Sequence, residues 1–166
     1  MFKETTISVV LTALMASTAI AGGHCASDKT LTEGKLTVAT GNPAYFPWVI
    51  DDAPESGQGF EAAVVYAVAK EMGFSDSDVV WVRSSFDEAI QPGAKDFDFN
   101  IQQYSITEDR AKVVDFSSAY YKSNQSIVSF KGSKIDGVTS IADLKGAKLG
   151  AAVASTSLDA IENQLG

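Results

Sequence analysis

The stretch QQYSITEDRAKVVDFSSAYY, residues 102–121, places an arginine where a helix disfavours it. Thr107 is a good N-cap residue for a short helix, and Arg110 falls in the first turn of that helix. The helix dipole disfavours a cation at this end by about 0.3–1 kcal/mol. We therefore expect a negative partner for Arg110, which is either Glu108 or Asp109 on the surface or an anion that the protein binds.

The segment before this stretch alternates strands with helices. Runs of β-branched and alternating apolar residues predict strands, and apolar residues four apart predict a long helix that Gly73 ends. The predicted strands are 35–40, 79–85 and 96–103, and the predicted helices are 57–74, with Phe60, Val64, Val68 and Met72 on one face, and 86–93.

The rest of the chain repeats this alternation. We predict strands over 124–130 and 147–153, a short helix over 140–146 and a last helix that opens within 154–166. Strands alternating with helices indicate an α/β fold with a mostly parallel sheet. Ligands bind such sheets outside the carboxyl ends of the strands, which here hold the sequences GNPAY, RSSF, QQYS and VAST.

The charge of the chain argues against a nucleic-acid partner. The 166 residues have a net charge of −8 and only two arginines, Arg83 and Arg110. Nucleic-acid binding needs clustered basic side chains.

Residues 1–21 have the features of a secretory signal peptide. Lys3 supplies a charged start, an apolar run extends from Ile7 to Ala16, and residues 19–21 form an A-x-A cleavage pattern. Cleavage near Ala21 would release the mature protein into the periplasm. A buried N-terminal helix is the alternative, whereas the run is too short for a membrane span.

The chain has one cysteine, Cys25, and one histidine, His24. A single cysteine excludes an intrachain disulfide. The same scarcity argues against a His/Cys metal centre and against a Ser-His or Cys-His nucleophile. A lipid anchor on Cys25 is an open alternative, although Gly22 and His24 stand where bacterial lipoproteins usually have Leu and a small residue.

Four motifs together resemble the bacterial extracellular solute-binding proteins of family 3, the polar amino-acid-binding components of ABC transporters. They are KLTVATGNPAYFPW, GQGFEAAVVYAVAKEMG, DFDFNIQQYSITEDRAKVVDFSSAYY and LKGAKLGAAVASTS. The third motif is close to the family pattern S-I-T-x-x-R-x-x-x-V-D-F-S-x-x-Y-Y, which makes the resemblance specific. It covers residues 34–165.

The resemblance implies a fold like that of type II periplasmic binding proteins, in which two α/β lobes close around a ligand by a hinge motion. We expect a flexible mature N-terminus over 22–33, a first lobe over 34–121, a hinge crossing over 122–126 and an incomplete second lobe over 127–166. Family members are considerably longer, so the chain is expected to be an N-terminal fragment. The rest would complete the second lobe and supply the acidic partner of the ligand's α-ammonium group.

The resemblance assigns Arg110 to the α-carboxylate of an amino-acid ligand, which a planar guanidinium can bind through two hydrogen bonds. Hydrogen bonds to charged groups contribute about 1.5–3 kcal/mol, which exceeds the dipole penalty. Ser105 is expected to add a donor to the same anion. Ser155 and Thr156 match a turn that holds the carboxylate from the second lobe, and N-capping is their alternative role.

Five further positions match ligand-contacting positions of the family. Tyr45 and Phe86 match aromatic residues that sandwich the ligand, with a place at the core or its edge as the alternative. Gln102 and Gln103 are expected to shape the pocket or contact the ligand, unless they are only polar residues at a strand end. Asn42 replaces a common Asp that pairs with cationic side chains, which argues against Lys, Arg or ornithine as ligand.

The implied function is a monomeric, non-catalytic binding protein that needs no cofactor or metal. It would capture an amino acid and deliver it to the membrane permease of an ABC transporter. Two alternatives on the same fold stay open. One is a cyclohexadienyl dehydratase-like enzyme, for which Glu61 is an acidic candidate at a position that is usually structural in the binding proteins. The other is a tethered extracytoplasmic sensor domain.

Overall fold

The computed structural model describes residues 29–165, and its centre is a parallel sheet of three strands. The strands are β1 (Leu36–Thr40), β2 (Val79–Arg83) and β3 (Phe99–Asn100), in the order β2-β1-β3. β1 pairs with both neighbours, with Val38 opposite Trp81 on one side and Phe99 on the other. This arrangement confirms the predicted α/β class. The expected signal peptide, residues 1–21, and Cys25 lie outside the described residues.

The third strand is shorter than the predicted range 96–103. The carboxylate of Asp98 accepts hydrogen bonds from the backbone N–H groups of Thr37 and Leu31, both at 2.7 Å. A side chain therefore occupies a place that a backbone carbonyl would take in a longer ladder. At the other end, Gln103 has a φ of 55°, which turns the chain out of the sheet.

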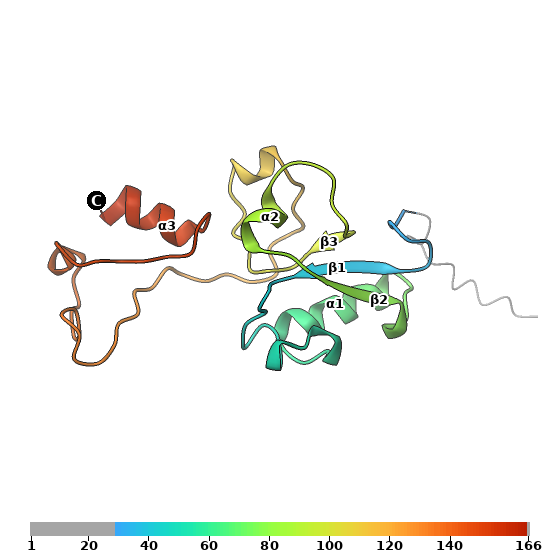
Figure 1. Cartoon of the computed structure of the whole chain (residues 1–166), viewed down its shortest axis with the longest axis horizontal. Coiled ribbons are helices and arrows are strands. Elements are labelled where there is room, and N and C mark those ends of the chain that lie inside the picture. Colours follow the sequence, from blue (N-terminus) through green and yellow to red (C-terminus); the bar gives the residue numbers. More distant parts are fainter. Residues whose placement is uncertain (1–28, 166) are drawn as a thin grey trace, which may run out of the picture.

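One face of the sheet packs on α1 (Phe60–Glu71), as Figure 1 shows. The helix ends where predicted, because Gly73 has a φ of 88° that suits a glycine after a helix. The residues buried in the shared core are Leu36, Val38, Val65, Ala69, Phe74 and Ile101. This core fixes the strand ends that support the site.

The buried face of α1 agrees only in part with the predicted one, since Val64 and Met72 pack against the core. Phe60 and Val68 are 41% and 40% exposed, whereas Ala62, Val65 and Ala69 are fully buried. The first turn is fixed by hydrogen bonds from the N–H groups of Phe60 and Glu61 to the carbonyls of residues 47 and 48. This anchor sets the rotation of the helix, so small side chains face the sheet.

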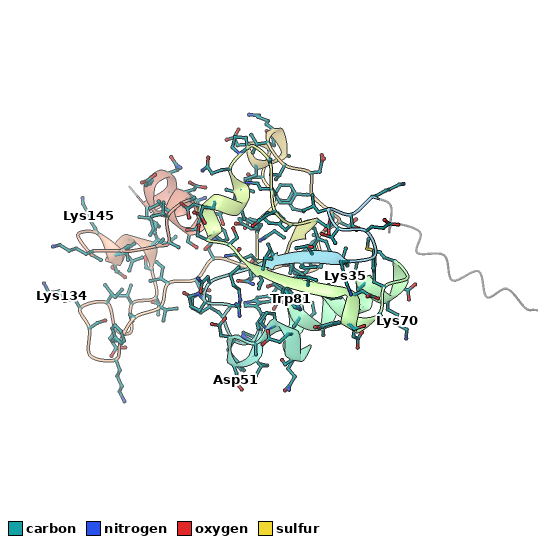
Figure 2. All side chains as sticks on the ribbon, turned by 45° about the vertical axis from the view of Figure 1, so that its right-hand side comes forward. Lys35, Asp51, Lys70, Trp81, Lys134 and Lys145 are labelled. Atoms are coloured by element: carbon teal, nitrogen blue, oxygen red, sulfur yellow. The ribbon has the colours of Figure 1, made fainter. Side chains whose placement is uncertain are left out.

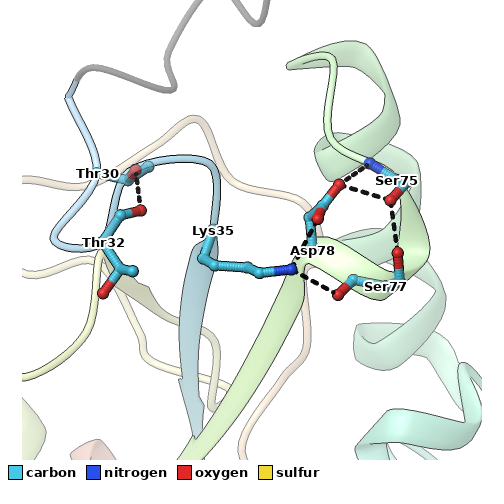
Figure 3. Close-up of polar contacts among 6 residues, drawn as sticks. All are labelled: Thr30, Thr32, Lys35, Ser75, Ser77 and Asp78. Atoms are coloured by element: carbon cyan, nitrogen blue, oxygen red, sulfur yellow. Dashed lines mark hydrogen bonds and ion pairs between the residues drawn. The ribbon is translucent and has the colours of Figure 1, made fainter.

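An ion pair lies at the N-terminal end of β1, the end away from the expected ligand site. Lys35 Nζ lies 2.8 Å from Asp78 Oδ1 and donates to the Ser77 carbonyl (Figure 3). Asp78 also accepts hydrogen bonds from Ser75. These contacts hold the N-terminal ends of β1 and β2 together.

The remaining helical elements are short. α2 (Phe86–Ile90) confirms the short helix predicted over 86–93, although it ends at Ile90, and it begins at a capping box formed by Ser85 and Glu88. The 3₁₀ turns are Ile50–Asp52, Pro54–Ser56, Asp76–Asp78, Arg110–Lys112 and Ile141–Leu144. The predicted short helix after Thr107 is thus a single 3₁₀ turn. Among the helices within residues 29–165, none has the length and apolar character needed to span a membrane.

Residues 122–150 run away from the first lobe, as the orange part of Figure 1 shows. The predicted strands 124–130 and 147–153 do not form, because no strand lies beside them within residues 29–165 to accept their backbone hydrogen bonds. Val128 and Phe130 are consequently 91% and 90% exposed. Lys134 and Lys145 project outward from this segment (Figure 2).

The chain ends in α3 (Thr156–Ala160), which continues as a π-helical turn, Ile161–Leu165. Ser155 caps α3, since its Oγ accepts a hydrogen bond of 3.2 Å from Leu158 N. The helix predicted within 154–166 is therefore confirmed. The predicted helix 140–146 is reduced to the 3₁₀ turn Ile141–Leu144, before Gly146 at φ 80°.

Candidate functional site

A cleft of about 220 Å³ lies at the carboxyl ends of β1 and β3, the edge where parallel sheets bind ligands. The loop after β1 forms one wall, and the start of α2 and the end of β3 contribute to the others. Ala152, from the segment after residue 122, also lines it. Five of the predicted site residues line this cleft: Asn42, Tyr45, Phe86, Gln102 and Gln103.

The loop after β1 is fastened to the sheet by Arg83 at the end of β2. Its guanidinium donates to the Gly41 carbonyl at 2.8 Å and to Asp52 Oδ1 at 2.6 Å. The same Asp52 oxygen accepts a hydrogen bond of 2.8 Å from Ala44 N. These bonds, from Ala44 first and Arg83 second, hold the pKa of Asp52 below its ordinary value. The loop that presents Asn42 and Tyr45 is therefore tied at both ends.

Phe86 and Tyr104 stack with their ring centroids 4.2 Å apart. The guanidinium carbon of Arg110 lies 5.6 Å from the Phe86 centroid and 5.5 Å from the Tyr104 centroid, which is the range of cation–π contacts. The Tyr104 hydroxyl donates to the Phe86 carbonyl, and burial raises the pKa of Tyr104. Phe86 thus lines the cleft and is also in contact with Arg110, which lies next to the lining residues.

Arg110 bridges the two halves of the chain. Its guanidinium donates to the Ser105 carbonyl at 2.8 Å and to the Ala154 carbonyl at 2.6 Å. Within residues 29–165 it forms no ion pair, and Asp109 pairs with Lys112 instead. The surface pairing of Arg110 with Glu108 or Asp109 is therefore not formed. Thr107 Oγ1 accepts a hydrogen bond of 3.2 Å from Arg110 N, but the N-cap residue of the 3₁₀ turn is Asp109 and not the predicted Thr107.

The sequence left two roles open for Ser155 and Thr156: capping the last helix, or holding the ligand's carboxylate. Ser155 caps α3 and also donates to the Ala152 carbonyl at 2.6 Å. The Thr156 hydroxyl instead faces the first lobe, 3.1 Å from Ser105 Oγ, and accepts from Gln125 Nε2 at 3.1 Å. Arg110, Ser105 and Thr156 consequently form one polar cluster beside the cleft.

Glu61 lies behind the cleft and is fully buried. Its carboxylate accepts from Gln103 N at 2.9 Å, from Gln103 Nε2 and from the Tyr120 hydroxyl. Burial raises the pKa of Glu61, although the hydrogen bonds from Tyr120 and Gln103 oppose that shift. Glu61 does not line the cleft. Its contacts join the start of α1, the end of β3 and residue 120.

Sequence reasoning missed the roles of Arg83, Asp52, Tyr104 and Tyr120. Arg83 is one of two arginines and follows a strand at the ligand edge, which is a signal that could have drawn attention to it. Asp52 gives no local signal, because its partner is 31 residues away.

The parallel sheet, the cleft at its carboxyl edge and an arginine shared with a second segment define a lobe of a two-lobed solute-binding protein. The family model of the bacterial extracellular solute-binding proteins, family 3, matches residues 36–164. The chain belongs to this family, whose fold is that of type II periplasmic binding proteins.

Three curated relatives support this assignment. The ABC transporter glutamine-binding protein GlnH of Bacillus subtilis is 33% identical over 63% of this chain and 38% of its own length. The arginine-binding extracellular protein ArtP of Bacillus subtilis is 32% identical over 79% of this chain and 50% of its own length. A probable histidine-binding protein of Campylobacter jejuni is 31% identical over 75% of this chain and 46% of its own length.

The chain therefore spans at most about half the length of these relatives. No solved structure gave a significant match.

Proposed function

We propose that the protein is the substrate-binding component of an ABC transporter for amino acids and delivers its ligand to a membrane permease from outside the cytoplasm. The observation that carries this proposal is the placement of Arg110. It lies between the first lobe and the segment that contains α3, beside the cleft at the carboxyl edge of the sheet. The names of the three relatives, a glutamine-binding, an arginine-binding and a probable histidine-binding protein, support the same ligand class.

Arg110 binds the α-carboxylate of the amino acid in this proposal. The two backbone carbonyls that it now contacts occupy only part of its five N–H donors. Ser105 and Thr156 add hydroxyl donors from opposite sides of the cluster, at 3.1 Å from each other. The aromatic rings of Phe86 and Tyr45 border the aliphatic part of the ligand, and Asn42, Gln102 and Gln103 surround the rest. Ser155 caps α3 and so helps to hold Thr156, the first residue of that helix, in place.

A binding role also agrees with the contacts of Glu61. An acid catalyst on this fold needs a carboxyl group that reaches the substrate. Glu61 instead has both oxygens occupied and lies outside the cleft lining. We propose accordingly that the protein has no catalytic activity, acts as a monomer and leaves the cytoplasm through the signal peptide 1–21.

A thermal-shift screen of the full-length protein against the common amino acids tests this function. A ligand that binds only the folded state raises Tm by mass action. We expect at least one α-amino acid to raise Tm, and its α-amide or decarboxylated analogue to have no effect. Steady turnover of prephenate or arogenate would contradict the proposal, and so would a full panel of amino acids without any shift.

A further inference from the structure

We infer that the cleft selects an amino acid with a carboxamide side chain. This inference rests on the proposed function, because it names the ligand side chain for the same site. It follows from three properties of the cleft: a lining without charged side chains, a free hydrogen-bond donor on Gln102 and a free hydrogen-bond acceptor on Gln103.

The described residues that line the cleft include no charged side chain. Three charged groups near the cleft are already engaged. Asp52 is bonded to Arg83 and Ala44, Glu61 is bonded to Gln103 and Tyr120, and Arg110 is assigned to the α-carboxylate. An ammonium, guanidinium or carboxylate on the ligand side chain would therefore lose its hydration without gaining a counter-charge.

Gln102 supplies the free donor. Its side chain is buried, and its Oε1 accepts a hydrogen bond of 3.4 Å from Asn100 Nδ2. Its Nε2 lies next to Gly41, since a Cβ on that glycine would stand only 3.1 Å away. Within residues 29–165 this amide nitrogen donates no hydrogen bond. Gly41 and Gln102 both line the cleft, and a side chain at residue 41 would press against this nitrogen.

Gln103 supplies the free acceptor. Its backbone N–H and its side-chain Nε2 both donate to the carboxylate of Glu61. This double contact fixes the orientation of the carboxamide, because an exchange of its oxygen and nitrogen would place Oε1 against a carboxylate. The Oε1 atom is left as the free acceptor of Gln103, which lines the cleft together with Gln102.

A carboxamide can satisfy both atoms at once. A hydroxyl or a neutral imidazole also carries a donor and an acceptor, but a carboxamide presents its oxygen and its NH₂ group side by side on one planar group. Its oxygen accepts from Gln102 Nε2, and its NH₂ group donates to Gln103 Oε1. A carboxylate offers acceptors only, an ammonium or guanidinium offers donors only, and an aliphatic chain offers neither. A site built to hydrogen-bond a ligand group discriminates strongly against analogues that lack it, because its own buried groups are then left unpaired.

Calorimetry on the full-length protein with the common amino acids, ornithine and norleucine tests the inference. We expect glutamine or asparagine to bind most tightly, at least about tenfold tighter than glutamate, ornithine and norleucine. Tightest binding of any amino acid without a carboxamide side chain would overturn the inference and leave the proposed function intact. If none of the amino acids bound, the proposed function itself would be overturned.

The variant Gln102→Glu changes the donor into an anionic acceptor of the same size. It should weaken glutamine binding at least about tenfold and strengthen ornithine binding. Gln58→Glu makes the same chemical change at an exposed position outside the cleft and should change neither affinity. Gln102→Met, which keeps the length without polar atoms, serves as a second variant should Gln102→Glu fail to fold. If a folded variant at residue 102 bound glutamine with unchanged affinity, Gln102 would have no part in ligand selectivity.

Discussion

Arg83 at the end of β2 bonds the Asp52 carboxylate at 2.6 Å and the Gly41 carbonyl at 2.8 Å. One guanidinium therefore holds both ends of the loop that carries Asn42 and Tyr45. The loop has little regular structure of its own, so its shape depends on this contact and on the hydrogen bond from Ala44 N to Asp52. The geometry of the cleft wall thus depends on a residue that does not line the cleft.

Replacement of Arg83 by methionine should loosen this loop without unfolding the core. Methionine keeps much of the apolar stem but removes every donor. We expect faster amide hydrogen exchange at Ala44 and weaker ligand binding in the full-length protein. Lys70→Met, on the exposed side of α1, is the matched control and should change neither. Unaltered exchange at Ala44 in the Arg83 variant would show that other contacts shape the loop.

Two carboxylates should make the protein less stable in acid. The pKa of Asp52 is lowered by its bonds to Ala44 and Arg83, and the pKa of Asp78 is lowered by Lys35 and Ser75. A lowered pKa means that the folded state favours the ionised form, so its contribution is complete above the ordinary Asp value of about 3.9 and is lost as pH falls below it. Urea unfolding at pH 6 and pH 3 measures the effect. Asp52→Asn and Asp78→Asn should each flatten this dependence, and an undiminished acid dependence in both would refute the assignment.

Of the polar residues in the first lobe, Glu61 should be the one whose substitution destabilises the fold most. Glu61→Ala leaves Gln103 N, Gln103 Nε2 and the Tyr120 hydroxyl without their acceptor, and each buried group left unpaired costs about 1–3 kcal/mol. Urea unfolding should show this loss, whereas Glu71→Ala at the exposed end of α1 should have little effect.

The pH dependence of Glu61 has the opposite sign to that of Asp52. Burial raises the pKa of Glu61, so the folded state favours the protonated form and this residue becomes less favourable to folding as pH rises through the raised value. Glu61→Gln should remove that part of the dependence above the ordinary Glu value of about 4.3. An unchanged profile between pH 4 and 7 would be inconsistent with the raised pKa.

Arg110→Ala should abolish most ligand binding in the full-length protein. Two hydrogen bonds to a charged carboxylate contribute about 1.5–3 kcal/mol each, which predicts a loss of at least about a hundredfold in affinity. Arg110→Lys should recover only part of it, because an ammonium cannot form the planar pair of bonds. Lys112→Ala, two residues away and exposed, is the control for charge. Calorimetry that gave equal affinities for Arg110→Ala and the unsubstituted protein would exclude the carboxylate role.

Thr156→Val tests the contact between the two segments. Valine keeps the branched shape and removes the hydroxyl that lies 3.1 Å from Ser105 Oγ. A net hydrogen bond contributes about 0.5–1.5 kcal/mol, so affinity should fall about two- to tenfold while Tm changes little. Thr139→Val, at an exposed position far from the cluster, should leave affinity unchanged. A loss of Tm without a loss of affinity would make Thr156 a purely structural residue.

The first lobe could be predicted from the sequence because its signals are local. The alternation of 36–40 and the residues of α1 determine element type, and Gly73 and Ser85 determine where helices end and begin. The same logic failed for 124–130 and 147–153. Their apolar pattern is strand-like, but a strand also needs a neighbour, and none is present among residues 29–165.

The sequence by itself determined the family, the parallel sheet and the candidate ligand residues, since each depends on residue types at short spacings. Tertiary structure decided which residues are adjacent. It paired Arg83 with Asp52, buried Glu61 under Gln103 and Tyr120, and brought Ser105 to Thr156 across 51 residues of chain. Such contacts leave no periodicity in the sequence, because the free energy that stabilises them comes from packing and hydrogen bonding between segments that meet only in the folded protein.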